Sequence, residues 1–323
     1  MAVEINTNNT SSSSSGGSTN IEIKTGFSSQ VKYKFVGECD LSTIPEDEIF
    51  KDIAKRMQNK RRLIIPIGLP NSGKSMFIAS LIAYAFRRAE KDDNSCNFEH
   101  VSDLELSGIQ SIIDDLDNQK TLGSTHRSHF SIIDLDMISN YRKNKKIKVS
   151  LLDFAGEDIL RLLGRMPDDQ NVGYKIGRIL DACIVQKAIF AILTPVDENF
   201  TELGDVSEFD KNEDSIMKGF IDRVKSHNPK LYQKTKFLMV VTKSDKLSDK
   251  TATKVFLKEH RNQLYNEYSS NSKSYGLIRY SVGEVMGDTI MDIKLRSPKN
   301  FWYTLYRWCT GMHVLPWWIR IFS

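Results

Sequence analysis

The amino-acid sequence predicts an α/β protein with a mainly parallel β-sheet covered by helices on both faces. Short β-branched runs alternate with amphipathic segments of helical length along most of the chain, as expected for parallel strands joined by crossover helices. A glycine-rich loop joins the first such strand to the first such helix. The chain of 323 residues is long enough for one large α/β domain or two small ones.

Six strands and six helices are expected. The predicted strands are 63–67, 130–138, 147–154, 188–193, 237–241 and 277–281. The predicted helices are 74–90, 107–118, 169–183, 214–226, 251–269 and 299–309, and residues 44–57 also have helical spacing. Only about eight residues join strands 130–138 and 147–154, which is a hairpin connection. One edge strand of the sheet should therefore be antiparallel.

The composition and charge of the chain argue against several classes of function. The net charge of +4 has no dense source that would indicate nucleic acid as a partner. The four cysteines have neither metal-ligand nor disulfide spacing, which fits a reducing cytoplasm. Residues 1–30 are Ser-, Asn- and Gly-rich and predict a disordered tail before one domain at 31–323. No secretory leader and no transmembrane segment are expected.

The stretch GLPNSGKS follows an apolar strand and precedes an amphipathic helix. It matches G-x-x-x-x-G-K-[ST], the loop whose backbone N–H groups surround a polyphosphate at a helix N-terminus. Lys74 supplies a positive charge for the β- and γ-phosphates, and the Ser75 hydroxyl can bind Mg²⁺. The nucleotide contacts expected from this loop are Gly68, Asn71, Ser72, Gly73, Lys74, Ser75 and Met76.

Two later strand ends bear on the γ-phosphate and on the base. Asp153 and Gly156 have D-x-x-G spacing. A carboxylate at a strand end can hold Mg²⁺ through its bound water, and a glycine N–H can approach a γ-phosphate. The sequence TKSD ends the strand at 237–241. Guanine presents two parallel donors that one carboxylate can accept, which suits Asp245, and the alkyl stem of Lys243 can lie along the base. At a third strand end, Ser281 and Val282 can bring backbone to guanine O6.

The order GxxxxGKS, Thr, DxxG, [NT]KxD and Ser-x-Gly resembles the Ras-like GTPases of the translation-factor-related P-loop class over about residues 60 to 310. In detail it is similar to bacterial GTPases of two-GTPase modules. The resemblance implies a three-layer P-loop NTPase fold with a six-stranded, mostly parallel sheet and the ligand at the strands' carboxyl ends. GTP or GDP and Mg²⁺ are the implied ligands.

Three departures from that family stand out. Thr242 occupies the place of the usual Asn, and it has one donor fewer. An insertion at about 92–124 lengthens the segment that follows the phosphate-loop helix, which in this family is the first nucleotide-sensing (switch) loop. The threonine of that loop, which binds Mg²⁺ and the γ-phosphate, is therefore expected to be Thr125, with Thr121 as the alternative. Glu157 stands where a water-orienting Gln is common, so slow hydrolysis is expected, with a partner or Arg127 as a further contributor.

The C-terminus is dense in aromatic residues. Trp302, Leu305, Tyr306 and Cys309 share a helical face that should pack on the sheet. The segment 316–321 can instead contact a partner protein or, more weakly, a membrane interface. The expected macromolecular partner is a protein effector or a second GTPase.

Three functions remain open from the sequence. The first is a GTP-hydrolysing switch that signals through loops around Thr125 and residues 153–158. The second is a P-loop ATPase or small-molecule kinase, in which TKSD is coincidental. The third is a scaffold that binds GTP without turnover, which Glu157 and Thr242 favour.

Overall fold

The computed structural model describes residues 33–35, 37–88, 95–100, 114–115, 118, 129–142, 145–168, 171–185, 188–196, 208–227, 229–233, 235–271, 273–283, 285–286, 289–290 and 295–315. The predicted tail at 1–30, helix 107–118 except for three of its residues, and segment 316–321 lie outside these ranges. Those predictions stay predictions.

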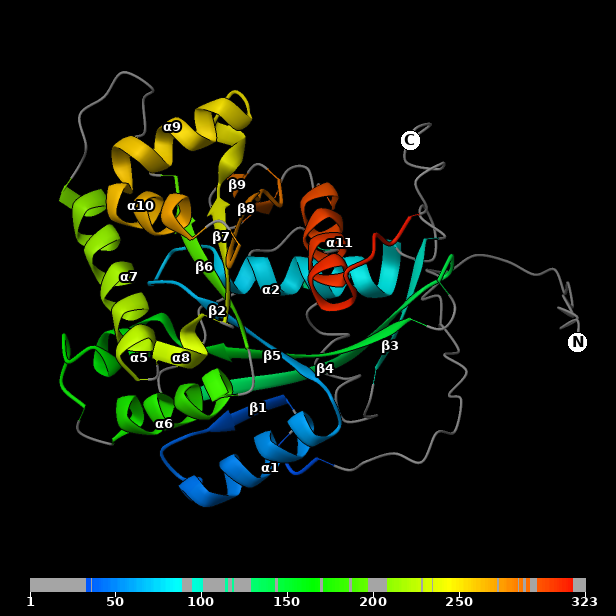
Figure 1. Cartoon of the computed structure of the whole chain (residues 1–323), viewed down its shortest axis with the longest axis vertical. Coiled ribbons are helices and arrows are strands. Elements are labelled where there is room, and N and C mark those ends of the chain that lie inside the picture. The colour runs from blue at the N-terminus through cyan, green and yellow to red at the C-terminus, as the bar shows by residue number, and fades with distance from the viewer. Residues whose placement is uncertain are drawn as a thin grey trace, which may run out of the picture. The chain divides into compact units, whose positions relative to one another are not determined.

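Five neighbouring strands of the sheet are parallel (Figure 1). In spatial order they are β5 (Lys146–Phe154), β2 (Arg62–Ile67), β6 (Ile189–Pro195), β7 (Lys236–Thr242) and β8 (Tyr275–Arg279). Strand β4 (His129–Ser139) pairs antiparallel with β5, with Ile133 opposite Leu151. The predicted α/β class, mainly parallel sheet and antiparallel hairpin are confirmed.

The sheet differs from the prediction at its antiparallel side. Two short strands, β1 (Gly37–Asp40) and β3 (Cys96–His100), both pair antiparallel with β4. Within the described residues the main sheet therefore has eight strands, and β4 is not at its edge. Neither GECD nor CNFEH alternates apolar and polar residues over enough positions to identify a strand. A separate hairpin pairs β9 (Val285–Met286) with β10 (Thr289–Ile290).

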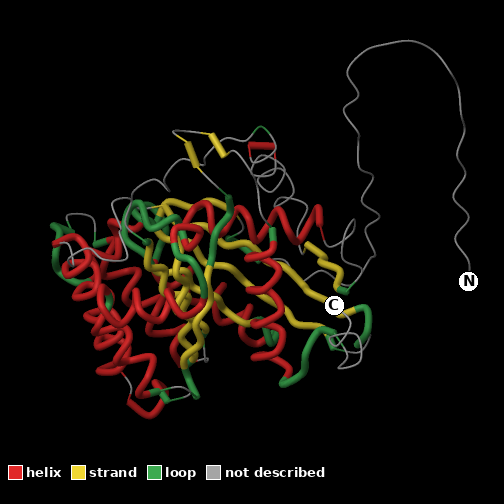
Figure 2. Tube along the Cα trace, turned by 90° about the horizontal axis from the view of Figure 1, so that it is seen from above, coloured by secondary structure: helices red, strands yellow, loops and turns green. Residues whose placement is uncertain are grey.

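Helices cover both faces of the sheet, and in Figure 2 the strands lie between them. One face carries α1 (Glu46–Gln58), α6 (Val172–Val185), α7 (Glu208–His227) and α10 (Asn262–Ser270). The other carries α11 (Arg296–Thr310) and α2 (Lys74–Ala83), which continues as a π-helix at Tyr84–Arg88. The described part also contains α5 (Gly156–Leu162), α8 (Pro229–Tyr232), α9 (Lys250–His260) and a 3₁₀ turn at Ser244–Lys246.

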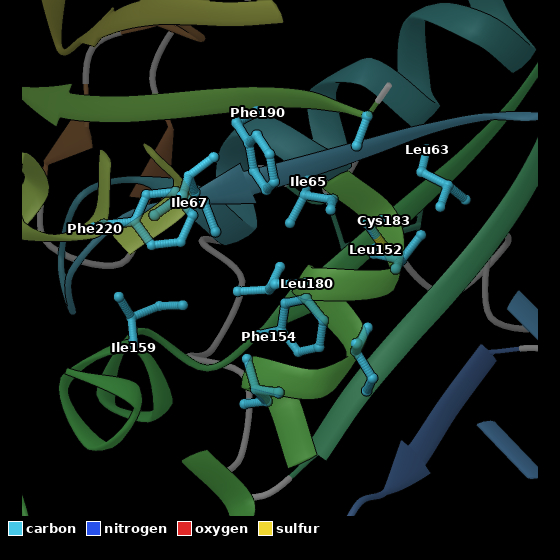
Figure 3. Packing of buried hydrophobic residues seen from close by; sticks show 14 of the residues in the cluster. Leu63, Ile65, Ile67, Leu152, Phe154, Ile159, Leu180, Cys183, Phe190 and Phe220 are labelled. Atoms are coloured by element: carbon cyan, nitrogen blue, oxygen red, sulfur yellow. The ribbon is translucent and has the colours of Figure 1, made fainter. Parts of the chain in front are cut away.

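Strand alternation divides the core into two layers. Leu63, Ile65 and Ile67 of β2 face α6 and α7, together with Phe190 and Phe220 (Figure 3). Ile64 faces the opposite way, among residues of α2 and α11. Trp302, Leu305 and Tyr306 are buried in that second layer, which confirms the predicted packing of the last helix.

Two of the differences between the predicted and the observed element bounds lie close to the polar contacts described below. The last strand of the parallel set ends at Arg279, two residues before the predicted end. The predicted helix 251–269 is two helices, α9 and α10, separated at Arg261. The Arg261 side chain is fully buried, where it pairs with Glu213 at 2.6 Å and donates to Thr194 at 2.8 Å. A hydrophobic pattern does not reveal such a buried polar anchor. Within the described residues, no helix is long and apolar enough to cross a membrane.

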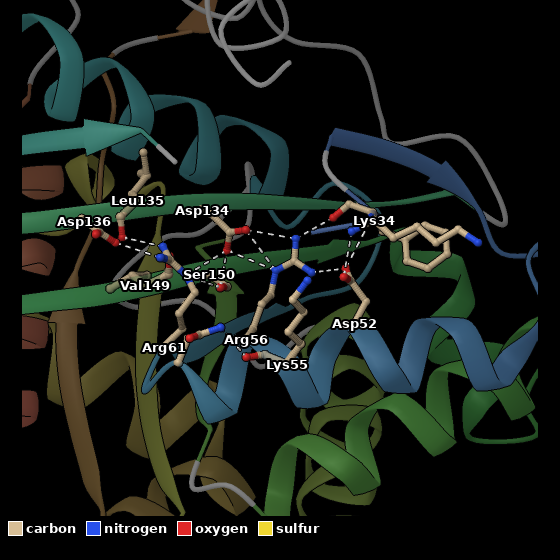
Figure 4. A network of polar contacts seen from close by, with 12 residues as sticks. Lys34, Asp52, Lys55, Arg56, Arg61, Asp134, Leu135, Asp136, Val149 and Ser150 are labelled. Carbon is tan, nitrogen blue, oxygen red and sulfur yellow. Dashed lines mark hydrogen bonds and ion pairs between the residues drawn. The ribbon is translucent and has the colours of Figure 1, made fainter. Parts of the chain in front are cut away.

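A buried polar network joins α1 to β4 and to the segment before β1 (Figure 4). The Arg56 guanidinium donates to Asp134 at 3.0 Å and to the Phe35 carbonyl at 2.5 Å, and it pairs with Asp52. Asp52 also accepts the Lys34 N–H at 2.8 Å. The Arg56 and Asp134 side chains are both fully buried. The network therefore fixes residues 33–58 on the antiparallel side of the sheet.

Arg61 extends this network across β4 and β5. Its guanidinium pairs with Asp136 at 2.8 Å and donates to the backbone carbonyls of Leu135 at 3.0 Å and Val149 at 2.5 Å. Its Nε donates to Ser150 Oγ at 3.1 Å. One side chain thus bonds to both strands of the β4–β5 hairpin, and β5 ends in the D-x-x-G sequence.

Replacing one member of this network should be strongly destabilising. In Arg56→Met, Asp52 stays buried without its cation and Asp134 keeps only the Arg61 cation, at 3.1 Å, so the free energy of unfolding should fall by about 3–5 kcal/mol. Lys34→Ala removes an exposed ion pair with Glu48, in which the side chains are 60% and 39% exposed, and should cost less than about 1 kcal/mol. Urea denaturation measures both. Equal losses would contradict the buried-network account.

Candidate nucleotide-binding site

The glycine-rich loop runs from the end of β2 to the start of α2. Asn71 and Gly73 have left-handed backbone conformations, with φ of 66° and 81°. Left-handed residues in such a loop turn successive N–H groups to one side, which makes an anion-binding concavity. A Cβ on Gly68 would lie 3.2 Å from the Leu193 Cβ and would collide with the Ser72 side chain. Glycine at 68 is therefore needed for the loop to close.

Ser72 Oγ lies inside this loop. The side chain is 1% exposed, and among the described residues its hydroxyl has no hydrogen-bond partner. A buried polar atom of this kind is unusual in a folded protein. Together with the glycine cradle, it is consistent with a polar ligand in the loop.

Lys74 and Asp153 meet beside the loop. The Lys74 ammonium pairs with Asp153 Oδ1, and the two side chains are 7% and 11% exposed. Lys74 begins α2 and Asp153 lies near the end of β5, and β5 is the parallel neighbour of β2. Ser75 and Met76 follow Lys74 in the first turn of α2 and are both half-buried. A hydroxyl and a carboxylate are oxygen ligands of the kind that Mg²⁺ takes, so Ser75 and Asp153 fit the predicted metal.

Gly156 packs against the backbone of the phosphate loop. A Cβ at this position would lie 2.6 Å from the Pro70 nitrogen and 2.9 Å from the Gly68 carbonyl oxygen. Helix α5 begins at Gly156, and Glu157 is half-buried in its first turn. The D-x-x-G sequence therefore reaches the phosphate loop with both its aspartate and its glycine.

The TKSD sequence is attached to the phosphate loop. Thr242 ends β7, and its hydroxyl donates to the Ser72 carbonyl at 2.7 Å. Lys243 adopts a left-handed conformation, with φ of 53°, and the 3₁₀ turn follows. Asp245 in that turn is exposed. Threonine at position 242 thus makes a side-chain hydrogen bond to the phosphate loop.

The end of β8 lies beside the TKSD turn. Ser244 N–H donates to the Tyr280 carbonyl at 3.2 Å, and Tyr280 N–H donates to the Val241 carbonyl at 2.8 Å. The Tyr280 hydroxyl is 2.6 Å from Ser80 Oγ of α2; burial raises the pKa of this phenol. Ser281 Oγ accepts from the Gly283 N–H at 3.3 Å, and Val282 packs against the second core layer.

Most of the predicted site residues thus lie on the side of the sheet where the parallel strands β2, β5, β7 and β8 have their carboxyl ends. Thr125, Thr121 and Arg127 lie outside the described residues, so their predicted roles stay predictions. Sequence reasoning missed Pro70, Arg279 and Tyr280. For Arg279 and Tyr280, the alternation of strand residues at 278–280 could have indicated a role, because it places these two side chains on opposite faces directly before the predicted base contact.

Residues 65–176 match the family model Double-GTPase 1. This segment is similar to the P-loop GTPases of the double-GTPase family. The matched residues include the phosphate loop, Asp153, Gly156 and Glu157, whereas Thr242, Lys243 and Asp245 lie beyond the match. The family resemblance inferred from the motifs is confirmed, and with it GTP binding as the general property.

No curated protein matches the sequence. Among solved structures, one match is "Structure of methanosarcina barkeri Roco2 RocCORdC bound to GDP", with 12% sequence identity and a TM-score of 0.31. The match covers 78% of this chain and 50% of that chain, so this chain spans half of that structure's length.

The contact between Gly156 and the phosphate loop has a direct consequence. In Gly156→Ala the added methyl would displace the loop backbone, so the Kd for GDP should rise about tenfold, or about 1.4 kcal/mol. Isothermal titration with GDP and Mg²⁺ measures this change.

Gly219→Ala is the matched control. A Cβ at Gly219 in α7 would have no atom within 4 Å, and alanine is favoured over glycine inside a helix. Its Kd for GDP should equal that of the wild type. An unchanged Kd in Gly156→Ala would show that the close contact does not shape the phosphate site.

Proposed function

We propose that the protein is a guanine-nucleotide switch that binds GTP and GDP with Mg²⁺ and hydrolyses GTP slowly. The observation that carries the proposal is the hydrogen bond from Thr242 to Ser72, which sets the TKSD turn beside the phosphate loop. A nucleotide needs both subsites at once, and a phosphate loop alone does not choose a base. The family match supports the GTPase class.

Each subsite has a proposed role. The loop N–H groups and Lys74 hold the phosphates, and Ser75 and Asp153 hold Mg²⁺, with Thr125 as a further ligand. Bound Mg²⁺ would neutralise charge on the phosphate oxygens. Asp245 accepts the N1–H and 2-amino hydrogens of guanine, Lys243 lies along the base, and the backbone at Ser281 and Val282 approaches O6. This division follows the strand ends at which the residues lie.

The switch itself is proposed to act through residues 153–158 and the loop containing Thr125. Because Gly156 lies against the backbone of residues 68–70, a γ-phosphate bound in that loop would meet the start of α5 directly. A change in α5 would then be presented to a protein partner. A second GTPase domain is the partner class that the family description suggests.

A base-specific variant tests the guanine assignment. Asp245→Asn should weaken GTP binding about 100-fold, or about 2.7 kcal/mol, because the amide keeps one uncharged acceptor and turns an N–H donor toward the 2-amino group. The same variant should gain binding of xanthosine triphosphate, whose 2-oxo group accepts a hydrogen bond from an amide. Fluorescence competition measures both affinities.

Glu259→Gln is the control for that experiment, since Glu259 is an exposed carboxylate on α9. It should leave both affinities unchanged. Unaltered GTP binding in Asp245→Asn would remove the guanine assignment and favour a P-loop ATPase or small-molecule kinase.

Turnover should be limited by Glu157. A carboxylate beside the anionic γ-phosphate orients water poorly, so Glu157→Gln should raise single-turnover hydrolysis of GTP about tenfold, which is a barrier lower by about 1.4 kcal/mol. Glu157→Ala, which removes the charge without a group to orient water, should give a smaller increase. No measurable turnover in any of the three proteins would favour the non-hydrolysing scaffold.

A further inference from the structure

The Arg279 side chain makes the side-chain hydrogen bonds that support the backbone of the TKSD turn. Arg279 is the last residue of β8, and its Nη2 donates to the carbonyl of Ser244 at 2.8 Å and to the carbonyl of Leu247 at 2.6 Å. These two carbonyls stand on either side of Asp245 in the sequence. A single planar group therefore fixes both ends of the short turn that carries the predicted base contact.

Strand alternation directs Arg279 to this place. Ile278 and Tyr280 belong to the core layer under α2 and α11, so the residue between them points to the opposite face. Arg279 is paired in register with Val241 of β7, one residue before Thr242. Its half-buried side chain thus lies under the turn that leaves β7.

Asp245 has little else to fix its position. Its side chain is exposed, and among the described residues it makes no hydrogen bond or ion pair. Two backbone bonds lie within the turn, from Lys246 N–H to the Lys243 carbonyl at 3.3 Å and from Leu247 N–H to the Ser244 carbonyl at 3.2 Å. The position of the carboxylate therefore depends on the backbone that Arg279 holds.

We propose that Arg279 is a positioning residue for guanine recognition: it holds the 244–247 turn so that both Asp245 oxygens face the N1–H and 2-amino groups of the base. This inference rests on the proposed guanine-binding function. Two parallel hydrogen bonds to one carboxylate require the carboxylate plane to be fixed, whereas a single bond tolerates rotation. Arg279 thereby acts on selectivity between bases and not on the phosphate contacts, which come from β2 and α2.

The chemistry of the two contacts favours arginine specifically. A guanidinium nitrogen directs its two hydrogens along fixed directions in one plane, and they can reach two carbonyls at once. A lysine ammonium at this place keeps the charge but has a flexible stem and no such planar geometry. Arg279→Lys is therefore the informative substitution, and Arg279→Gln removes the charge as well.

The test compares GDP with inosine diphosphate, which lacks only the 2-amino group. In the full-length wild type with Mg²⁺, GDP should bind more tightly than inosine diphosphate, and ADP should bind weakly. In Arg279→Lys the Kd for GDP should rise about tenfold and that for inosine diphosphate less, so their ratio should shrink about fivefold. Arg307→Lys, at an exposed site on α11, should keep the wild-type ratio.

The outcomes separate the two claims. If wild type prefers GDP over ADP and Arg279→Lys keeps the ratio of GDP to inosine diphosphate, the positioning role is overturned while the guanine assignment stands. A lower melting temperature in Arg279→Lys with an unchanged ratio likewise assigns Arg279 to stability alone. If wild type binds ADP as tightly as GDP, the proposed function fails, and this inference fails with it. Should Arg279→Gln not fold, Arg279→Lys decides alone.

Discussion

The hydrogen bond from the Thr242 hydroxyl to the Ser72 carbonyl joins two loops that arise from different strands. Strand β6 lies between β2 and β7. The phosphate loop and the TKSD turn can meet because both follow the carboxyl ends of parallel strands, which lie on the same side of the sheet. This bond sets the separation between the phosphate and base subsites. Lys74, Asp153 and Gly156 then complete the phosphate side, and Arg279 supports the base side. The proposed switch depends on that arrangement.

The antiparallel side of the sheet is fastened to the rest of the protein by residues that precede the phosphate loop. Arg56 connects α1 to Asp134 in β4. On the other side of α1, the Lys175 ammonium of α6 donates to the carbonyls of Leu41, Ser42 and Ile44 at 2.6, 3.3 and 3.2 Å. Helix α5 packs against α6 at Gly173. The segment before the phosphate loop is therefore in contact with the β4–β5 hairpin through Arg56, and with the α5–α6 pair that follows D-x-x-G through Lys175.

Much of the fold could be predicted from the sequence, because the parallel strands are continuous apolar runs and the phosphate loop has a specific spacing. The site residues at strand ends could be placed on one edge for the same reason. Strands β1 and β3 could not, because they are short and lack alternation, and their pairing depends on distant partners. The break at Arg261 and the support by Arg279 depend on buried polar contacts with residues far away in sequence, which a local pattern does not record.

The central claim is that the edge formed by these strand ends selects guanine. Displacement of a fluorescent GDP analogue from the full-length protein tests it most directly, with unlabelled GTP, ATP and inosine triphosphate as competitors in the presence of Mg²⁺. The account predicts strong displacement by GTP, weaker displacement by inosine triphosphate and almost none by ATP. Equal displacement by ATP and GTP would contradict it, because the phosphate loop alone would then account for binding.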